Sequence, residues 1–382
     1  MRKRAMAVQI ITTTKSDSYA SISAAADALR DGALVVFPTE TTYGVAANAA
    51  QPEAMRRLRT IKGRHDARPF TVHLGQPTDA RCYVSAPSPI ARRLARRAWP
   101  GPLTLVCGVT DPGQTEFAAR HAAALDEVFF DGAVGLRCPA HPAAEQLLRA
   151  SNAPIVASSA NRRGGAPALD FGAALEALGQ DVDYAIDGGP TRYRAASTIV
   201  RVGAASWSIE RVGALEERTV ARLARSETLM VCTGNSCRSP LAEYVYRREL
   251  AQALGVDAAQ LAELGYFVSS AGASAYEGAP MSAGSLQELS QRGIDGAAHR
   301  SQPLTVERIQ RCERIYGMTE AHRAAVLELA PGAADRVALL DAHGPVEDPI
   351  GGGQEDYRRC AEQIERATKA RVKEQVDEDR DW

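Results

Sequence analysis

Val-Cys-Thr-Gly-Asn-Ser-Cys-Arg-Ser-Pro, residues 231–240, is the stretch that decides the fold of the second half of the chain. It follows the apolar run Leu229–Val231, and its proline stands where a helix would begin, because proline is favoured in the first helical turn. Strand-like, Gly-containing and helical segments then alternate, which is typical of an α/β domain with a parallel sheet. We therefore predict that a strand delivers Cys232 to a loop in front of a helix N-terminus.

Such a loop has the chemistry of a phosphate site. The backbone N–H groups between Cys232 and Arg238, together with the helix N-terminus, can cradle a tetrahedral oxyanion. Their positive field favours a thiolate on Cys232 that can attack phosphorus, and the planar guanidinium of Arg238 can hold two phosphate oxygens. Ser239 can donate a hydrogen bond to the departing sulfur. The predicted phosphate loop comprises Thr233, Gly234, Asn235, Ser236, Cys237 and Ser239.

Attack by a thiolate also requires a proton donor for the leaving group. Asp348, followed by Pro349 in the glycine-rich segment 346–353, is the candidate donor, and it would then act as the base for water in the second step. Together with Cys232 and Arg238, this residue predicts a cysteine-dependent phosphatase that needs no metal cofactor.

The first half carries a weaker signal. The hydroxyl-rich segment 38–44 and the segment 158–161 each follow a predicted strand, and Lys62, Arg64 and Arg68 follow a predicted helix. Alternation of β-rich and helical runs predicts an α/β or α+β domain. The half has no Gly-x4-Gly-Lys-Ser/Thr loop, so the residues alone predict an anion-binding cleft without specifying the anion.

Length and composition bound the possibilities. A chain of 382 residues favours two domains, and 45% hydrophobic and 24% charged residues exclude a disordered or fibrous protein. Because no apolar run is long enough for a membrane helix, and because the seven cysteines show no CxxC repeat, we expect a cytoplasmic protein with reduced thiols and no membrane partner. The net charge of −1 hides a basic part up to residue 213, with 25 basic and 19 acidic side chains, and an acidic remainder.

The predicted organisation has two domains, at 1–213 and 228–370. A charged, partly helical connector at 214–227 joins them, and a charged tail at 371–382 follows, in which a helix end runs into disorder.

The second half resembles the low-molecular-weight protein tyrosine phosphatases, whose loop is Cys-x5-Arg-Ser and whose acid is an Asp-Pro. Ser270–Gly272 and His299–Ser301 also fall in the family's order. The resemblance implies a Rossmann-like fold with a central parallel sheet and a phosphocysteine intermediate. Within the family, Cys-Thr-Gly-Asn at 232–235 and the segment Met318–His322 are most similar to the bacterial protein-arginine phosphatases.

The resemblance leaves the phosphoprotein substrate open between phosphoarginine and phosphotyrosine. Ser236 stands where tyrosine-specific members usually carry a bulky apolar residue. Ile350 stands where those members carry an aromatic residue and where the arginine phosphatases usually carry phenylalanine.

Two further alternatives concern cysteines. Thioredoxin-coupled arsenate reductases have a similar loop, but they need a downstream redox pair, and this chain offers only Cys312 and Cys360. Cys237 could form a reversible disulfide with Cys232, or it could be a packed loop thiol.

Residues 8–213 resemble the YrdC-like threonylcarbamoyl-AMP synthases. Their Lys-x-Arg and Ser-x-Asn signature is matched by Lys62, Arg64, Ser159 and Asn161. The resemblance implies a twisted mixed sheet with helices, and condensation of L-threonine, bicarbonate and ATP with release of pyrophosphate. Mg²⁺ would accompany the ATP, held largely by phosphate and water. The product would pass to the tRNA-modification machinery that acts on adenosine 37.

The resemblance also implies the ligand-binding residues. Those of the ATP side are Lys62, Arg64, Arg68, Ser159, Asn161 and Arg211. Those of the L-threonine side are Thr41, His73, Arg137 and Ser197. We therefore predict a bifunctional enzyme. The alternative is that the first half is an RNA-binding module, whose basic face binds tRNA directly while only the phosphatase is catalytic.

Overall fold

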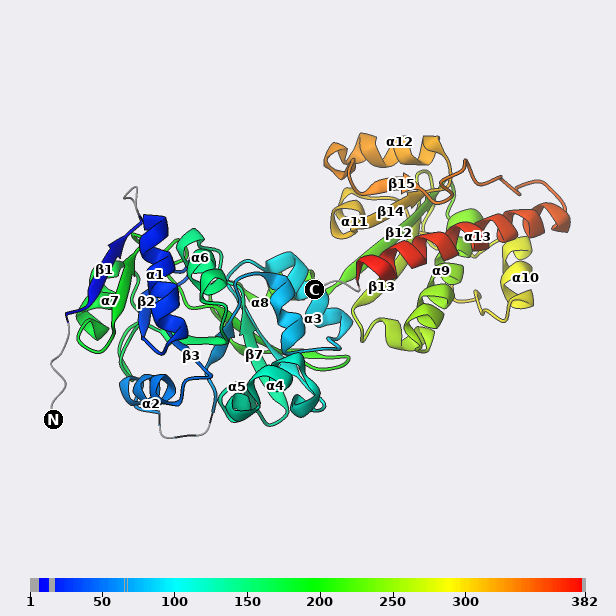
Figure 1. Ribbon diagram of the computed structural model, residues 1–382. Helices are drawn as coiled ribbons and strands as arrows, with labels where there is room; N and C mark the ends of the chain where they lie inside the picture. The colour runs from blue at the N-terminus through cyan, green and yellow to red at the C-terminus, as the bar shows by residue number, and fades with distance from the viewer. Residues whose placement is uncertain (1–6, 14–17, 65, 67, 380–382) are drawn as a thin grey trace. The chain divides into compact units, whose positions relative to one another are not determined.

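The computed structural model describes residues 7–13, 18–64, 66 and 68–379 (Figure 1). It divides into two compact units, the first ending at Ala224 and the second beginning at Arg225. Helix α8 (Glu217–Ala224), which occupies most of the predicted connector, belongs to the first unit. Strand β12 of the second unit begins at Ser226, so a single residue separates the two elements.

The first unit is built around one mixed sheet with the strand order β1-β9-β2-β3-β8-β4-β7-β5-β10-β11. Strand β6 lies outside this order and pairs with β7. The sheet contains parallel pairs, such as β4 with β7, and antiparallel pairs, such as β5 with β7, as expected for a twisted mixed sheet. The strands are β1 (Gln9–Thr12), β2 (Val35–Phe37), β3 (Gly44–Asn48), β4 (Thr71–His73), β5 (Leu103–Gly108), β6 (Phe129–Phe130), β7 (Ala133–Arg137), β8 (Ile155–Ser159), β9 (Tyr184–Asp187), β10 (Thr198–Val202) and β11 (Trp207–Arg211).

Helices cover both faces of this sheet, because successive strand side chains point to opposite sides. Val35 and Phe37 of β2 pack in a cluster with α1 and α6, whereas Val36 packs in the larger cluster with α2, α3 and α7. The helices of the unit are α1 (Ser18–Arg30), α2 (Pro52–Ile61), α3 (Pro89–Ala98), α4 (Glu116–His121), α5 (Leu125–Val128), α6 (Pro142–Ser151), α7 (Phe171–Leu178) and α8.

The basic helix α3 packs against α8. Arg93 is fully buried and its Nε donates to the carbonyl oxygen of Ala224 at 3.0 Å, while Arg97 Nη1 donates to that of Leu223 at 2.8 Å. Cations are favourable at a helix C-terminus, where carbonyl groups lack partners in the helix. Two arginines of α3 therefore cap the C-terminus of α8.

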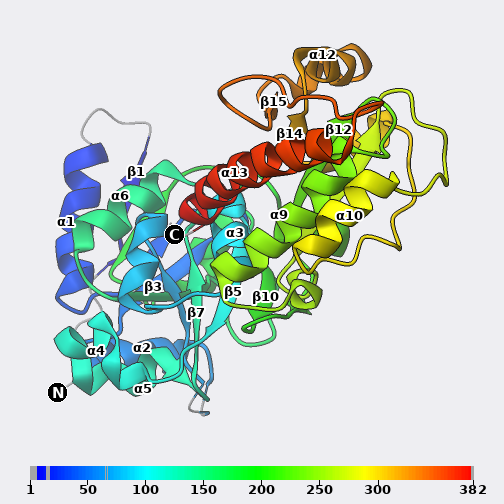
Figure 2. The ribbon, with the colours of Figure 1, turned by 90° about the vertical axis from the view of Figure 1, so that its right-hand side faces the viewer.

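The second unit has a parallel sheet with the strand order β13-β12-β14-β15. Its strands are β12 (Ser226–Cys232), β13 (Tyr266–Gly272), β14 (Arg314–Gly317) and β15 (Val337–Leu339). Its helices are α9 (Arg238–Leu254), α10 (Ala283–Gln291), α11 (Val306–Arg311), α12 (Glu320–Leu329) and α13 (Gln354–Glu378). Helices α9, α10 and α13 lie side by side on one face, and α11 and α12 cover the other (Figures 1 and 2).

The charged segment at 371–382 is helical as far as the structure describes it, so the expected disorder is wrong there up to Glu378. Helix α13 continues to that residue, and Val372, Gln375 and Val376 are buried along it. The Tyr246 hydroxyl donates to Gln375 Oε1 at 2.6 Å, which ties the end of α13 to α9. An apolar stripe against α9 thus outweighs the high charge of the segment. Among the described residues, no helix combines the length and the apolarity needed to cross a membrane.

Candidate active sites

The phosphate loop runs from the carboxyl end of β12 to the N-terminus of α9, as predicted. Cys232 ends the strand and is 3% exposed. Asn235 has a left-handed φ of +52°, and its backbone N–H donates to Cys232 Sγ at 3.3 Å. Gly272 of β13 makes room for this turn, because a Cβ there would lie 2.5 Å from the carbonyl oxygen of Thr233 and 2.8 Å from the nitrogen of Asn235.

A buried hydrogen-bond network lies beneath the loop and includes Ser239, which contacts the predicted nucleophile Cys232. Asn235 Nδ2 donates to Ser239 Oγ at 2.9 Å and to Ser270 Oγ at 2.8 Å, and Ser270 donates to Glu243 at 2.5 Å. Because Ser239 Oγ accepts from Asn235, its own proton can go to Cys232 Sγ, 2.9 Å away, or to the carbonyl oxygen of Ala271, 3.4 Å away, and the shorter contact favours Cys232. A donor at that position stabilises a thiolate.

The structure brings Arg238 and Asp348 together, although they are 110 residues apart in the chain. Arg238 is 6% exposed; its Nη1 donates to the carbonyl oxygen of Val346 at 3.2 Å and its Nη2 pairs with the Asp348 carboxylate. The other Asp348 oxygen accepts from the backbone N–H of Ile350 at 3.2 Å. The predicted nucleophile loop, anion-binding arginine and proton donor therefore form one site.

The remaining loop residues differ in exposure. Thr233 and Gly234 are exposed at the mouth of the loop, and Ser236 is half-buried. Cys237 is buried, with its Sγ 3.8 Å from the Tyr357 hydroxyl, and all seven cysteines are free thiols in this structure.

Two residues beside the loop escaped the sequence analysis. Nε2 of His322, in the first turn of α12, lies 2.9 Å from Thr233 Oγ1. Tyr276 is 89% exposed, in a loop whose Ser274 N–H donates to the carbonyl oxygen of Thr233 at 2.9 Å. His322 lies in a segment that supported the resemblance, but only tertiary structure reveals its contact. An aromatic residue four positions after the segment Ser270–Gly272, which supported the resemblance, was the available signal for Tyr276.

In the first unit, strand register aligns several predicted ligand residues. His73 ends β4 directly beside Arg137, which ends the parallel strand β7. On the other side of β7, Thr104 of β5 pairs with Ile199 of β10, which in turn pairs with Arg211 of β11. Four polar residues, namely His73, Arg137, Thr104 and Arg211, therefore lie at neighbouring positions across the sheet. They line a cavity of about 150 Å³ together with Arg64, Ser159 and Ser197.

Arg137 forms an ion pair with Glu40, a residue that the sequence alone did not single out. Its Nη2 lies 2.9 Å from Glu40 Oε1 and 2.6 Å from Thr41 Oγ1. The side chains of this ion pair are only 7% and 3% exposed. Arg137 Nε is buried and lacks a hydrogen-bond partner among the described residues. Thr41 is fully buried, so it contacts Arg137 rather than lining the cavity.

His73 and Ser197 contribute fixed polar groups to the cavity. Burial, and then the charge of Arg137, lowers the pKa of His73 to about 3, so the imidazole is neutral. Its Nδ1 lies 3.0 Å from the carbonyl oxygen of Thr71 and therefore carries the proton, which leaves Nε2 as an acceptor. Ser197 Oγ lies 2.9 Å from Thr104 Oγ1 and accepts from Arg211 Nη2 at 3.1 Å.

The cations of the predicted ATP side occupy different environments. Lys62 Nζ donates to the carbonyl oxygens of Ser159 and Asn161 and to Asn161 Oδ1, so it holds the segment after β8. Arg64 lies in the cavity, with its guanidinium 4.8 Å from the centre of the Phe70 ring. Arg68 is exposed and does not line the cavity.

A protein-built metal site is not found within 7–13, 18–64, 66 and 68–379, where His, Cys, Asp and Glu form no group of three that could hold an ion. Glu40 is the carboxylate nearest to Arg137, and both of its oxygens are used, by Arg137 and by the N–H of Ala140. The side chains of the cavity thus suit the anionic phosphates of ATP rather than Mg²⁺ itself.

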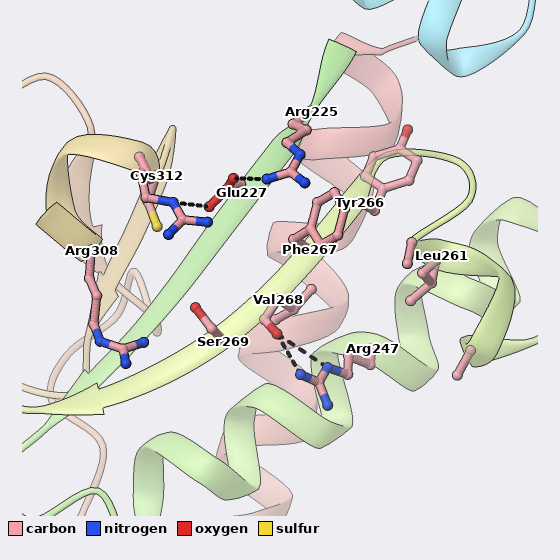
Figure 3. Close-up of a pocket in the computed structure, with 13 residues that line it drawn as sticks. Arg225, Glu227, Arg247, Leu261, Tyr266, Phe267, Val268, Ser269, Arg308 and Cys312 are labelled. Atoms are coloured by element: carbon pink, nitrogen blue, oxygen red, sulfur yellow. Dashed lines mark hydrogen bonds and ion pairs between the residues drawn. The ribbon is translucent and has the colours of Figure 1, made fainter. Parts of the chain in front are cut away.

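A second concavity of the phosphatase-like unit, of about 390 Å³, contains none of the predicted site residues (Figure 3). It lies along β13 and includes Arg247, which donates twice to the carbonyl oxygen of Val268, and Arg308 of α11. Cys312 lines its inner side, packed in the core, and burial raises the pKa of its thiol to about 12. This environment gives no support to a redox role for Cys312.

Comparisons with known proteins confirm both resemblances. A model of the Sua5, YciO and YrdC family, described as telomere recombination, matches residues 27–213, and a model of the low-molecular-weight phosphotyrosine protein phosphatases matches residues 227–381. A putative threonylcarbamoyl-AMP synthase of Mycobacterium tuberculosis is 35% identical over 53% of this chain and 88% of its own length. A protein-arginine-phosphatase of Geobacillus stearothermophilus is 35% identical over 36% of this chain and 87% of its own length.

A solved structure agrees with the fold. A double variant of Sua5 from Pyrococcus abyssi aligns with 87% of this chain and 98% of its own chain, with a TM-score of 0.50 and 22% identity. The chain therefore belongs to the Sua5, YciO and YrdC family through its first unit and to the low-molecular-weight phosphotyrosine protein phosphatase family through its second.

Proposed function

We propose that the first unit makes threonylcarbamoyl-AMP from L-threonine, bicarbonate and ATP. The observation that carries this proposal is the cavity of about 150 Å³ in which Arg64, His73, Arg137, Ser197 and Arg211 meet. Three guanidinium groups, a neutral imidazole and a hydroxyl in one small cavity suit a small zwitterion beside phosphates better than a polynucleotide. The orphaned Nε of Arg137 offers a donor to the threonine carboxylate.

The proposed reaction gives the cationic residues of the site separate roles. The amino nitrogen of threonine first bonds to the carbon of bicarbonate with loss of water, which gives a carbamate. An oxygen of this carbamate attacks the α-phosphorus of ATP, the bond from that phosphorus to the oxygen bridging to the β-phosphate breaks, and pyrophosphate leaves. Arg64 and Arg211 stabilise negative charge on the phosphates, while Lys62 keeps Ser159 and Asn161 in place beside them. Mg²⁺ bound to the triphosphate would supply further charge neutralisation. The adenylate would then serve tRNA-modification machinery downstream.

Release of pyrophosphate from ATP tests this activity. With bicarbonate present, release should require L-threonine, fall strongly in Arg64→Ala and be unchanged in Cys232→Ser, which alters only the second unit. Salt-sensitive binding of tRNA without threonine-dependent release would instead favour the RNA-binding alternative.

We further propose that the second unit is a phosphatase in which the Cys232 thiolate attacks phosphorus. The arrangement of Cys232, Arg238 and Asp348 around one loop carries this proposal. The bond from phosphorus to the leaving group breaks while Asp348 gives that group a proton. Water then attacks the phosphocysteine, Asp348 takes the proton, and the thiolate leaves with the help of the Ser239 hydroxyl.

Phosphoarginine in a protein is the substrate we favour. The small, half-buried Ser236 leaves room at the loop, and the relative from Geobacillus stearothermophilus is a protein-arginine-phosphatase. Phosphotyrosine is the second candidate, because the exposed Tyr276 follows two residues after Ser274, whose N–H donates to Thr233, and could flank an aromatic ring. The ratio of kcat/KM for phosphoarginine and phosphotyrosine peptides decides between them.

The nucleophile has its own test. Cys232→Ser should abolish hydrolysis of both peptides and retain binding of inorganic phosphate, because the N–H cradle and Arg238 remain. Residual turnover in this variant would refute the assignment. Cys312→Ser is the matched control, since that thiol is packed in the core away from the loop.

A further inference from the structure

His322 contacts the phosphate loop from outside it. It stands in the first turn of α12, after the N-cap residue Thr319. Its Nδ1 lies 3.1 Å from the backbone nitrogen and 3.0 Å from Oγ1 of Thr319. A backbone N–H can only donate, so Nδ1 is the acceptor and carries no proton. The imidazole therefore takes the place that Glu or Gln holds in the usual capping box.

This contact defines the tautomer of His322. The side chain is buried, and burial, followed by the charge of Arg238, lowers its pKa to about 4 against the opposing effect of Asp348. The imidazole is neutral at neutral pH, and with Nδ1 accepting, the proton sits on Nε2. That N–H points at Thr233 Oγ1, 2.9 Å away, and donates to it.

The direction of this bond determines what the Thr233 hydroxyl can do. Its oxygen accepts from His322, so its own proton is free to donate elsewhere. The residue follows the nucleophile directly and is exposed at the mouth of the loop. Its backbone is fixed, because the carbonyl oxygen accepts from the N–H of Ser274 at 2.9 Å. The residue stands in the loop that is proposed to hold the phosphoryl group, so an oxygen of that group would be an acceptor for this proton.

We propose that His322 is a positioning residue that orients the Thr233 hydroxyl to donate a hydrogen bond to an oxygen of the bound phosphoryl group. The inference rests on the phosphatase activity proposed above, and it adds a residue of α12 to a site otherwise built from β12, α9 and the loop of Asp348. Relative to a freely rotating hydroxyl, a donor held in this way is already oriented when the substrate binds.

A double-mutant cycle tests the proposal. Thr233→Val, His322→Leu and the double variant are compared in the full chain for kcat/KM with p-nitrophenyl phosphate and for the dissociation constant of inorganic phosphate. Each single change should cost roughly tenfold in both, the size expected for one hydrogen bond to a charged group. The double variant should be no worse than Thr233→Val alone, because His322 acts only through that hydroxyl.

Two further variants separate this role from a structural one. His322→Gln keeps an acceptor for Thr319 and a donor for Thr233, so it should recover most of the loss. Thr305→Val removes the N-cap bond of α11, in which Oγ1 accepts from the Arg308 N–H at 3.3 Å, and should leave both constants unchanged.

Additive losses in the cycle, or a Thr233→Val variant that matches the original chain, would overturn the inference. A chain that hydrolyses no phosphate ester or phosphoarginine would refute the proposed phosphatase. The dissociation constants of inorganic phosphate, measured for the same variants, would still decide the role of His322.

Discussion

Arg238 and Asp348 form an ion pair at the loop after β12: the guanidinium proposed to bind phosphate is bound to the carboxylate proposed as the proton donor. Arg238 is almost fully buried, whereas the Asp348 side chain is 43% exposed on the glycine-rich loop. The more exposed partner can move away when an anion arrives, so the pair keeps the arginine oriented without blocking the site.

We expect Asp348→Asn to separate binding from chemistry. Loss of the proton donor should lower kcat by roughly 10²–10⁴-fold. Loss of the carboxylate charge should free Arg238 and tighten the binding of inorganic phosphate, measured as competitive inhibition. Glu347→Gln is the matched control at an exposed neighbouring position. Weaker phosphate binding in Asp348→Asn would contradict the role of the pair.

The buried pair of Glu40 and Arg137 leads to a prediction for the first unit. In Glu40→Gln the Arg137 charge stays buried without a counter-charge, a change that typically costs about 3–5 kcal/mol. The KM for L-threonine should rise as well, because Arg137 loses its fixed orientation.

Chemical unfolding and threonine-dependent pyrophosphate release measure the two effects. Glu53→Gln breaks an exposed pair with Arg56 and should change the free energy of unfolding by less than about 0.5 kcal/mol. Equal effects of the two substitutions would show that burial of the Glu40 pair carries no special weight.

The elements that the sequence predicts best are short runs of branched apolar residues, such as those that became β2, β8 and β12. Strand β3 is not predicted from the sequence, because its residues Gly44–Asn48, Gly-Val-Ala-Ala-Asn, have little intrinsic β preference. All five of its residues are buried between β2 and β8, so pairing with neighbouring strands decides its conformation. Such pairing is a property of the whole sheet and leaves no local signal.

The candidate sites show the same contrast between residues that a local motif identifies and residues that only tertiary contacts identify. Residues in one contiguous motif, such as Cys232 to Ser239, could be placed from the sequence because the loop itself fixes their geometry. Glu40 and His322 act through partners 97 and 89 residues away, so only the folded chain identifies them. The roles of Lys62 and Thr41 also depend on tertiary contacts, since both hold neighbouring groups instead of facing the cavity.

Lys62 gives the prediction that is most sensitive to pH. Burial, and then the charge of Arg64, lowers the pKa of Lys62 from 10.5 to about 8. Three acceptors surround Nζ, two of them 3.0 Å away, and only the ammonium form has three protons for them. Because the pKa is lowered, the charge is lost as pH rises through about 8, well before an ordinary lysine titrates. ATP binding to the free protein should therefore weaken between pH 7 and pH 9.

Three forms of the protein test this effect by equilibrium ATP binding at pH 7, 8 and 9. Lys62→Gln is neutral throughout, so its affinity should be low and should lack the step near pH 8. Lys62→Arg stays charged and should keep its affinity at pH 9. Since bound triphosphate favours the ammonium, the midpoint in the complex should lie above that of the free protein. A step of equal size in Lys62→Gln would assign the pH dependence to another group and leave Lys62 with a packing role alone.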